Sequence, residues 1–236
     1  MKKIKLKNKT FTSDARLDRV KQFDERSKNY SIRKVTGAKP FRSYTWRCLQ
    51  WLDQGSDGAC VGFSIAHELI ARPAEVKKLN NKFAKEKIYW EAQKIDEWKG
   101  GSYSGAKPFY EGTSVLAGTK VVNELRYIES YHWAFSLADL KIGVGYHGPA
   151  VIGINWYEGM MDTDKKGFVF PTGEVLGGHA ILVRGINIKE NYFLLRNSWG
   201  KGWGINGDCK ISFKSMSKLL KEDGEAVFFL SRHTKV

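Results

Sequence analysis

The sequence predicts an α+β protein built from two packed lobes, and two observations carry this prediction. Apolar residues recur with helical spacing in the first half of the chain, whereas β-branched runs dominate beyond Pro149. The 236 residues, 42% of them hydrophobic, are enough to bury one sizeable core. A helical lobe packed on a strand-rich lobe leaves a crevice between them, and we expect a ligand site there.

We interpret residues 1–39 as a basic N-terminal arm, because charged residues alternate there with scattered apolar ones and a turn signal at Gly37 and Pro40 closes the stretch. The formal charge of the chain is +14, and residues 1–50 hold 15 Lys and Arg against 4 Asp and Glu. The positive charge is therefore concentrated in the first fifth of the chain. It either keeps the arm solvated or binds an anionic partner such as nucleic acid, and the sequence leaves both readings open.

Residues 40–236 are predicted to form one domain, with a helical lobe at about 40–145. Its first helix begins near Cys60, after a polar turn that ends at Gly58, because apolar residues follow with helical spacing until Pro73 bounds the run. Two further helices are predicted at 83–98 and 114–126.

The strand-rich lobe is predicted at about 146–236. Its apolar runs are short, rich in β-branched and aromatic residues, and bounded by turn residues, which is typical of antiparallel strands. The predicted strands are 150–154, 167–170, 180–186, 192–196, 209–213 and 226–230.

Several classes of protein are disfavoured by the sequence. No run approaches the roughly 18 to 20 apolar residues of a membrane helix, so no membrane association is expected. The cationic start lacks the apolar stretch and cleavage site of a secretory signal, so we expect no export by that route. The three cysteines, Cys48, Cys60 and Cys209, suit neither a disulfide framework nor paired zinc ligands. We therefore expect a protein of the reducing cytoplasm without a metal or other cofactor.

Cys60 has the surroundings of a reactive thiol. It lies in the first turn of a predicted helix, where unpaired N–H groups and the helix dipole lower a thiol pKa. A nucleophilic thiol needs a base, and His67 lies about 10 Å further along the same helix, out of reach. His179, at the start of a buried strand, is the better candidate. Cys48 and Cys209 have no helix start or glycine turn beside them, so we interpret both as core residues.

Two amide side chains complete a candidate catalytic set. Asn197 follows a predicted strand, and its side-chain oxygen could orient the His179 imidazole. Gln54 precedes Cys60 by six residues and offers an N–H group that could stabilise a developing oxyanion together with the Cys60 backbone N–H. The combination is typical of thiol-based nucleophilic catalysis.

Three blocks of the sequence resemble the signature blocks of papain-like cysteine peptidases, in the same order and with similar spacing. They are Gln54-Gly-Ser-Asp-Gly-Ala-Cys60-Val-Gly-Phe-Ser64, Gly178-His179-Ala180 and Asn197-Ser-Trp-Gly-x-Gly-Trp-Gly204, and the resemblance covers about residues 42–236. It implies a papain-like fold, with a helical left lobe packed on a β-barrel-like antiparallel right lobe and a catalytic cleft between them. It also implies that Cys60 is the nucleophile, His179 the general base and acid, Asn197 the orienting residue and Gln54 an oxyanion donor.

The same resemblance implies residues that bind substrate. Gly112 and Thr113 match the segment that pairs with the substrate backbone. Gly178 and Ala180 flank the catalytic histidine, and Ala180 is expected to line the main specificity pocket. Trp199 is expected to shield the hydrogen bond between the histidine and the asparagine from water.

The sequence also departs from the pattern of the secreted members of the family. Asp57 and Val61 stand where those members have a disulfide cysteine and a tryptophan, which points to an intracellular variant. The roughly 40 residues before the first block are too few for a long inhibitory propeptide, so activation by cleaving such a segment is not expected. The chain is most similar to the compact bacterial and phage versions, and a phage-encoded copy would act in the host cytoplasm.

The expected activity is hydrolysis of peptide or isopeptide bonds in a protein or peptide substrate, through a thioester intermediate. Two alternatives stay open at this point. The first is acyl transfer or deamidation on the same triad. The second is a papain-like binding module that the basic arm, residues 1–39, tethers to nucleic acid or a protein.

Overall fold

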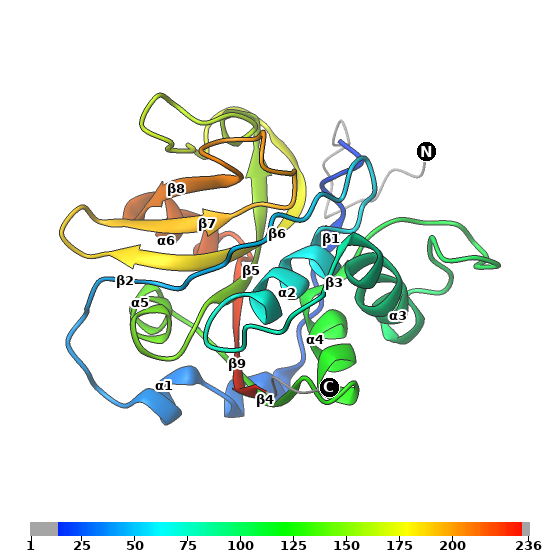
Figure 1. Cartoon of the computed structure of the whole chain (residues 1–236), viewed down its shortest axis with the longest axis horizontal. Helices are drawn as coiled ribbons and strands as arrows, with labels where there is room; N and C mark the ends of the chain where they lie inside the picture. Colours follow the sequence, from blue (N-terminus) through cyan, green and yellow to red (C-terminus); the bar gives the residue numbers. More distant parts are fainter. Residues whose placement is uncertain (1–13, 233–236) are drawn as a thin grey trace.

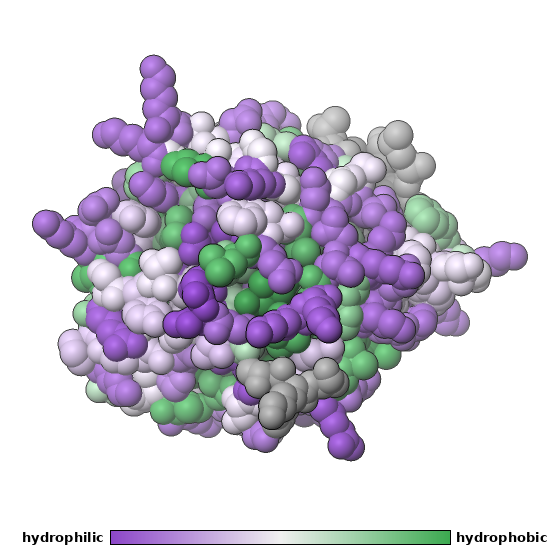
Figure 2. Space-filling view, viewed as in Figure 1, coloured by the Kyte–Doolittle hydropathy of each residue, from purple (hydrophilic) through white to green (hydrophobic). Residues whose placement is uncertain are grey.

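Two lobes make up the structure (Figure 1): the helices at Cys60–Ile70, Trp90–Ile95 and Val115–Glu124 lie together on one side, and most of the antiparallel sheet lies on the other side with the helices at Leu137–Tyr146 and Phe213–Lys221. The computed structural model describes residues 14–232, so residues 1–13 of the predicted arm lie outside the described part. Hydrophilic side chains cover most of the face seen in Figure 2, with smaller hydrophobic areas between them. Within residues 14–232, no helix has the length and apolar character needed to cross a membrane. The predicted α+β class is confirmed.

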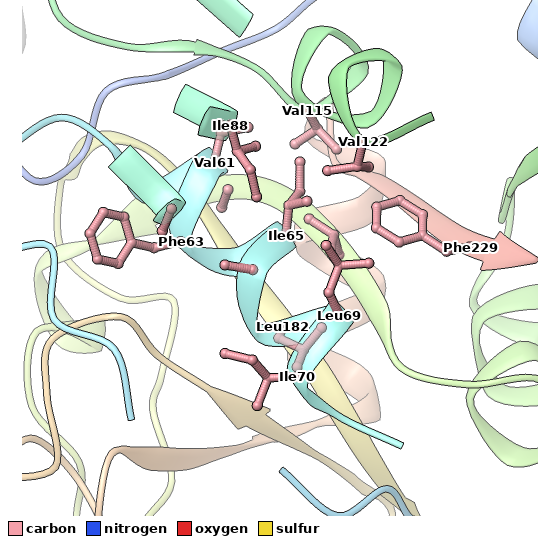
Figure 3. Packing of buried hydrophobic residues seen from close by; sticks show 14 of the residues in the cluster. Val61, Phe63, Ile65, Leu69, Ile70, Ile88, Val115, Val122, Leu182 and Phe229 are labelled. Atoms are coloured by element: carbon pink, nitrogen blue, oxygen red, sulfur yellow. The ribbon is translucent and has the colours of Figure 1, made fainter. Parts of the chain in front are cut away.

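The helical lobe is built around α2 (Cys60–Ile70), in which every residue is buried. This helix packs against η2 (Phe83–Tyr89), a π-helix, and against α4 (Val115–Glu124). Gly118 of α4 allows the close approach, because a Cβ there would lie only 2.6 Å from the side chain of Ile65. The core between these helices and the sheet contains Val61, Ile65, Leu69, Ile88, Val115, Val122, Leu182 and Phe229 (Figure 3).

The sheet has seven antiparallel strands in the order β4, β9, β5, β6, β7 and β8, with β2 paired to β6 beside this path. Alternate residues of a strand point to opposite faces, so the central strands contribute to two cores. Val151 and Leu182 belong to the core that contains α2, whereas Ile152 and Ile181 belong to the core on the other face. The strands are β2 (Tyr44–Thr45), β4 (Ile128–Trp133), β5 (Ala150–Tyr157), β6 (Val175–Asn187), β7 (Tyr192–Arg196), β8 (Asp208–Ser212) and β9 (Glu225–Arg232).

The helix predicted at 83–98 is present but divided and shorter. Its first part is η2, and its second part is α3 (Trp90–Ile95). The strand predicted at 167–170 is absent: Phe168 makes only an isolated bridge, to Lys210. The ladder is not extended at either end of this stretch. Gly167, at its start, has a φ of 83°, and Pro171, directly after its last residue, has no N–H to donate.

Two helices in the strand-rich part of the chain were not predicted. They are α5 (Leu137–Tyr146) and α6 (Phe213–Lys221). Each begins at a serine whose side chain accepts a hydrogen bond from a backbone N–H of the first turn, with Ser136 capping α5 and Ser212 capping α6. Such N-caps supply the hydrogen bonds that the start of a helix lacks. Strand β4 was also not predicted.

Residues 14–39 pack against the rest of the chain rather than standing apart from it as an arm. Strand β1 (Arg19–Val20) pairs in parallel with β3 (Thr113–Ser114). Beyond it lie η1 (Glu25–Asn29) and α1 (Ile32–Thr36), which packs on α5. Four arginines of this stretch have carboxylate partners: Arg16 with Asp14, Arg19 with Glu225, Arg26 with Asp24 and Arg33 with Asp139.

Candidate active site

Cys60 lies at the point where the helical lobe meets the sheet. It is the first residue of α2, and its side chain is completely buried. The backbone N–H of Ala180, on β6, donates to the Cys60 Sγ at 3.4 Å. His179 directly precedes Ala180 on β6, so its main chain lies close to the residue that contacts the thiol, although His179 stands 119 positions after Cys60 in the sequence. Helix α2 packs against β6, so the two candidate catalytic residues lie on neighbouring elements.

Asn197 holds the His179 ring. The distance between His179 Nε2 and Asn197 Oδ1 is 2.9 Å, and the backbone N–H of Ser198 donates to the same oxygen at 2.8 Å. The geometry follows from the sheet, because β6 and β7 are paired and Asn197 comes directly after β7. His179 Nδ1 makes no hydrogen bond of ordinary geometry within the described part of the chain, although the Arg16 backbone lies beside the ring. Asn197 thus holds the ring through Nε2 and leaves Nδ1 as the other nitrogen.

Tryptophan rings enclose the imidazole. The Trp199 ring centroid lies 5.1 Å from that of His179, and the Trp156 centroid lies 4.7 Å from it in an edge-on arrangement. Trp203 packs on both indoles. The sequence analysis singled out Trp199 but missed Trp156, because an aromatic residue inside a strand looks like any other core residue. The hydrogen bond between the histidine and Asn197 is buried, since the two residues are 0% and 1% exposed.

Gln54 presents its amide to the same site from the loop before α2. Its Nε2 donates to the backbone carbonyl of Asp57 at 2.7 Å and to that of Arg16 at 3.2 Å. Its Oε1 accepts a hydrogen bond from Ser198 Oγ at 2.6 Å. The carbonyls of Asp57 and Arg16, which can only accept, fix the end of the amide that carries Nε2, and Ser198 binds the other end. The sequence analysis gave Ser198 no role, although it directly follows Asn197.

The predicted substrate-binding glycines lie against a segment of the chain itself. We call residues 14–22 the cleft segment. Its Arg19 pairs with Thr113, and its Asp18 bridges to Gly178. A Cβ at Gly112 would lie 2.0 Å from the Asp18 carbonyl oxygen, and one at Gly178 would lie 2.2 Å from the Arg19 carbonyl oxygen. Only glycine allows a main chain to approach this closely.

Burial by the cleft segment changes the protonation of the catalytic pair. Burial raises the pKa of the Cys60 thiol to about 12 and lowers the pKa of His179 to about 4. The start of a helix was expected to lower the thiol pKa, but burial outweighs that effect. The described conformation therefore holds a neutral thiol beside a neutral imidazole.

Two acidic side chains lie close together beside Gly58. A Cβ at Gly58 would lie 2.5 Å from Asp18 Oδ2 and 2.8 Å from the Glu111 Cβ, so the two acidic side chains are close to each other. Glu111 accepts a hydrogen bond from the Gly58 N–H at 3.3 Å. Burial, followed by the charges of Glu111 and Asp14, raises the pKa of Asp18 to about 7. The docked segment therefore holds a carboxyl group that titrates near neutral pH.

The other cysteines and His67 lie outside this site. Cys48 and Cys209 are buried, and burial raises the pKa of both thiols. His67 Nε2 accepts a hydrogen bond from the backbone N–H of Leu52 at 3.0 Å, so this histidine is part of the core. Among residues 14–232, no group of three or more His, Cys, Asp or Glu side chains is arranged to hold a metal ion.

Comparison with solved structures identifies the fold. The chain is similar to xylellain, a cysteine protease from Xylella fastidiosa, with a TM-score of 0.66 and 18% identity over 92% of this chain and 95% of that one. It is also similar to procathepsin L 3 of the Tenebrio molitor larval midgut, with a TM-score of 0.59 and 16% identity over 92% and 75% of the two chains. At these identities the likeness concerns the fold, which is papain-like.

Curated relatives match parts of the chain. An uncharacterized peptidase C1-like protein of Acanthamoeba polyphaga mimivirus is 25% identical over 213 residues, 71% of this chain and 66% of the relative. Cathepsin B-like cysteine proteinase 4 of Caenorhabditis elegans is 37% identical over 67 residues, 28% of this chain and 20% of the relative. The chain therefore spans less than two thirds of the length of these relatives.

The chain also matches a protein-family model. The model described as "Papain family cysteine protease" matches residues 86–223, more than half of the chain. This stretch includes His179 and Asn197 and begins after Cys60. Together with the papain-like fold, the match establishes that the chain belongs to the papain family of cysteine proteases.

Proposed function

We propose that the chain is a cysteine peptidase that hydrolyses peptide or isopeptide bonds with Cys60, His179, Asn197 and Gln54. One observation carries the proposal: a peptide main chain already lies across these residues. The Arg16 carbonyl accepts a hydrogen bond from Gln54 Nε2, the group that would bind the oxyanion, and the Asp18 backbone lies beside the Cys60 thiol. A site that holds a peptide backbone in this way suits the chemistry of peptide bonds.

The described conformation is the closed state of this enzyme. Cys60 and His179 are both fully buried, so no substrate carbonyl can reach Sγ while the cleft segment stays in place. When the segment leaves, water returns to the cleft and reduces the desolvation that separates the two pKa values. The start of α2 then favours the thiolate, and Asn197 favours the imidazolium. Opening of the cleft is therefore the step that makes the catalytic pair reactive.

Catalysis in the open state begins when the Cys60 thiolate attacks the carbonyl carbon. The resulting oxyanion accepts hydrogen bonds from Gln54 Nε2 and from the backbone N–H of Cys60. His179 gives its proton to the leaving amine, which breaks the C–N bond and leaves a thioester on Cys60. His179 then takes a proton from water, which attacks the thioester and releases the acid product. Asn197 keeps the ring oriented through both transfers.

The test is cleavage of a peptide library, followed by mass spectrometry, with the wild type and Cys60→Ala side by side. We expect Cys60→Ala to abolish cleavage and an epoxide-type thiol inhibitor to label Cys60 in the wild type. The matched control is Cys209→Ala, which removes another buried cysteine that lies outside the site. Cleavage that survives Cys60→Ala would refute the proposal.

Product masses separate hydrolysis from related reactions on the same residues. Hydrolysis adds water across the peptide bond, acyl transfer joins the acyl group to an added amine, and deamidation converts a side-chain amide to an acid without breaking the chain. We expect the products of hydrolysis. Predominance of either of the others would assign the triad to that reaction instead.

A further inference from the structure

Helix α6 carries a row of lysines beside a groove on the sheet lobe. Lys214, Lys218 and Lys221 line this groove, which has a volume of about 590 Å³, and all three are exposed. The apolar part of the lining comes from Leu137 of α5 and Phe213 of α6. Because the lysines are four and three residues apart, they lie on one face of the helix. This face of α6 is therefore positively charged and borders a partly apolar groove.

Aromatic rings connect this row to α5 and to the stretch before β2. Lys141 of α5 lies over the ring of Phe213, with Nζ 3.8 Å from the ring centroid. The same Nζ lies 5.2 Å from the centroid of Phe41, whose side chain is 45% exposed. One lysine thus bridges the groove and an exposed ring on the neighbouring segment.

Two further cations lie where α5 ends, at Tyr146. Lys39 Nζ and the Arg42 guanidinium lie over the Tyr146 ring, 4.9 and 4.2 Å from its centroid. Both cationic residues are exposed. Cations and rings therefore alternate from the stretch before β2, along α5, to α6. The name basic stripe is used below for the cations Lys39, Arg42, Lys141, Lys214, Lys218 and Lys221 together with the rings of Phe41 and Tyr146.

Two carboxylates near the stripe already have partners. Glu222, which also lines the groove, accepts a hydrogen bond from Tyr157 OH at 2.6 Å and lies 3.9 Å from Lys218 Nζ. Asp139 of α5 pairs with Arg33 at 2.8 Å. Six cations therefore outweigh the acidic groups beside them, and a surface of this kind attracts a polyanion.

We propose that the basic stripe binds single-stranded nucleic acid. Proteins hold single strands by combining a cationic groove, which follows the phosphates, with aromatic rings on which bases stack. Phe41 offers such a ring, and so does Tyr44, which is 39% exposed and lies 5.2 Å from the Arg42 guanidinium. An acidic peptide could use the cations, but glutamate and aspartate have no flat faces to stack on the rings. The exposed rings therefore favour nucleic acid.

The stripe is separate from the start of α2. Helices α5 and α6 contribute Leu140, Phe213 and Leu219 to the core on the sheet face away from α2, the helix that begins with Cys60. A strand bound to the stripe thus leaves α2 uncovered. The inference goes beyond the proposed peptidase function and does not depend on it, so its test needs no catalysis.

Fluorescence anisotropy with a labelled oligo(dT) of about 20 nucleotides measures the binding. The protein is full length and carries Cys60→Ala, which prevents self-digestion. We expect it to bind and to lose affinity as the salt concentration rises, because the cations displace counterions from the strand. Absence of binding at low salt would overturn the proposal.

Removal of two charges from the stripe tests where the strand binds. In the same background, Lys214→Gln/Lys221→Gln should weaken binding about tenfold and make the slope of log affinity against log salt shallower by about 1.4, since each phosphate contact contributes about 0.7. Lys218 is left in place because it donates to the Pro171 carbonyl at 2.9 Å.

The matched control is Lys77→Gln/Lys87→Gln, which removes the same charge from exposed positions of the helical lobe. It should bind like the parent protein. Unchanged binding by Lys214→Gln/Lys221→Gln, or an equal loss in the control, would show that the strand does not bind at the stripe and would overturn the proposal.

Stacking distinguishes nucleic acid from an acidic peptide. Phe41→Ala should weaken oligo(dT) binding at least about fivefold and leave the salt slope unchanged, because it removes a ring and no charge. An unchanged affinity would contradict stacking on this ring. Poly-glutamate with the same number of charges should compete at least about tenfold more weakly than unlabelled oligo(dT). Equal competition would assign the stripe to acidic peptides and overturn the nucleic-acid proposal.

Discussion

Two buried arginine–glutamate pairs occupy different regions of the molecule. Arg19 and Glu225 meet in the cleft, whereas Arg232 of β9 donates to Glu68 of α2 at 2.7 Å, with side chains 6% and 0% exposed. The chemistry and the burial are similar, but the parts joined differ. Glu68 and Arg232 connect the two lobes, which stay together, while Arg19 connects the cleft segment to a lobe that it must leave.

The same pair of residue types can therefore hold two parts of a protein together permanently, or hold a segment that is able to leave. Breaking a buried pair leaves an uncompensated charge unless that charge regains water or a new partner. Glu68 lies within the core and can regain neither, whereas Glu225 faces a cleft that opens. The first pair should therefore govern folding, and the second should govern access to Cys60.

The largest expected effect is a loss of stability on breaking the ion pair between Glu68 and Arg232 inside the core. Arg232→Ala should lower the free energy of unfolding by about 3–5 kcal/mol, because Glu68 is left buried and unpaired. Urea denaturation in a Cys60→Ala background measures this without self-digestion. Lys189→Ala, at an exposed position, is the control. A loss below about 1 kcal/mol would show that the pair is no structural joint.

Breaking the cleft pair should change activity more than stability. Arg19→Ala removes the side chain that anchors the cleft segment, so a larger fraction of molecules is open and the rate of peptide cleavage should rise about tenfold. Initial rates on a fluorogenic peptide measure the change. The free energy of unfolding should fall by less than in Arg232→Ala. An unchanged or reduced rate would contradict the assignment of residues 14–22 as the closing segment.

The pH dependence of closure should follow Asp18. Its pKa is about 7 when the segment is docked, above the ordinary value of 3.8, so the protonated form favours docking. Closure is therefore strongest at acid pH and weakens as the pH rises through 7. Asp18→Asn cannot ionise and should stay closed, so at pH 8 it should be several-fold less active than the wild type.

The ratio of the wild-type activity to the Asp18→Asn activity isolates the effect of Asp18 on closure, because Cys60 and His179 titrate in both proteins. This ratio should narrow as the pH falls from about 7 to about 3, because below the ordinary value of 3.8 Asp18 of the wild type is protonated in both states. A ratio that does not vary with pH would rule Asp18 out as the titrating group.

The smallest effect is expected at an exposed pair of the same segment. Lys21 forms an ion pair with Asp223, with side chains 39% and 73% exposed. Exposed pairs contribute little, so Lys21→Ala should change the cleavage rate by less than about twofold. A change as large as that of Arg19→Ala would mean that net positive charge, rather than the buried contact of Arg19, holds the segment.

The sequence predicted the elements whose pattern is local and regular. Helix α2 begins at Cys60 as expected, β7 has the predicted bounds of 192–196, and the two lobes follow the predicted order. Helices α5 and α6 were missed because their signals are single capping serines rather than long apolar stripes. The strand expected at 167–170 failed because a backbone turn at Gly167 outweighs the β propensity of its neighbours.

Of the site residues, only those that lie in short sequence motifs could be predicted. Cys60, His179, Asn197 and Gln54 each stand in a short recognisable block, and the fold brings them together. The contacts of Ser198, Trp156 and Glu225 depend on pairing between strands that are distant in the sequence, which no local pattern reveals. The position of residues 14–22 was missed for the same reason: their alternating charges resemble a solvated arm, but Arg19 finds its partner 206 residues away.

The complete burial of Cys60 also bears on how long the enzyme survives before use. Peroxide oxidises thiolates, and sulfinic and sulfonic acids formed on a nucleophilic cysteine end its activity for good. In the closed state the thiol has a pKa of about 12 and no exposed surface, so oxidants find neither the reactive form nor a path to the sulfur. Under the proposed function, the cleft segment would therefore protect the nucleophile from oxidation and expose it only while the cleft is open.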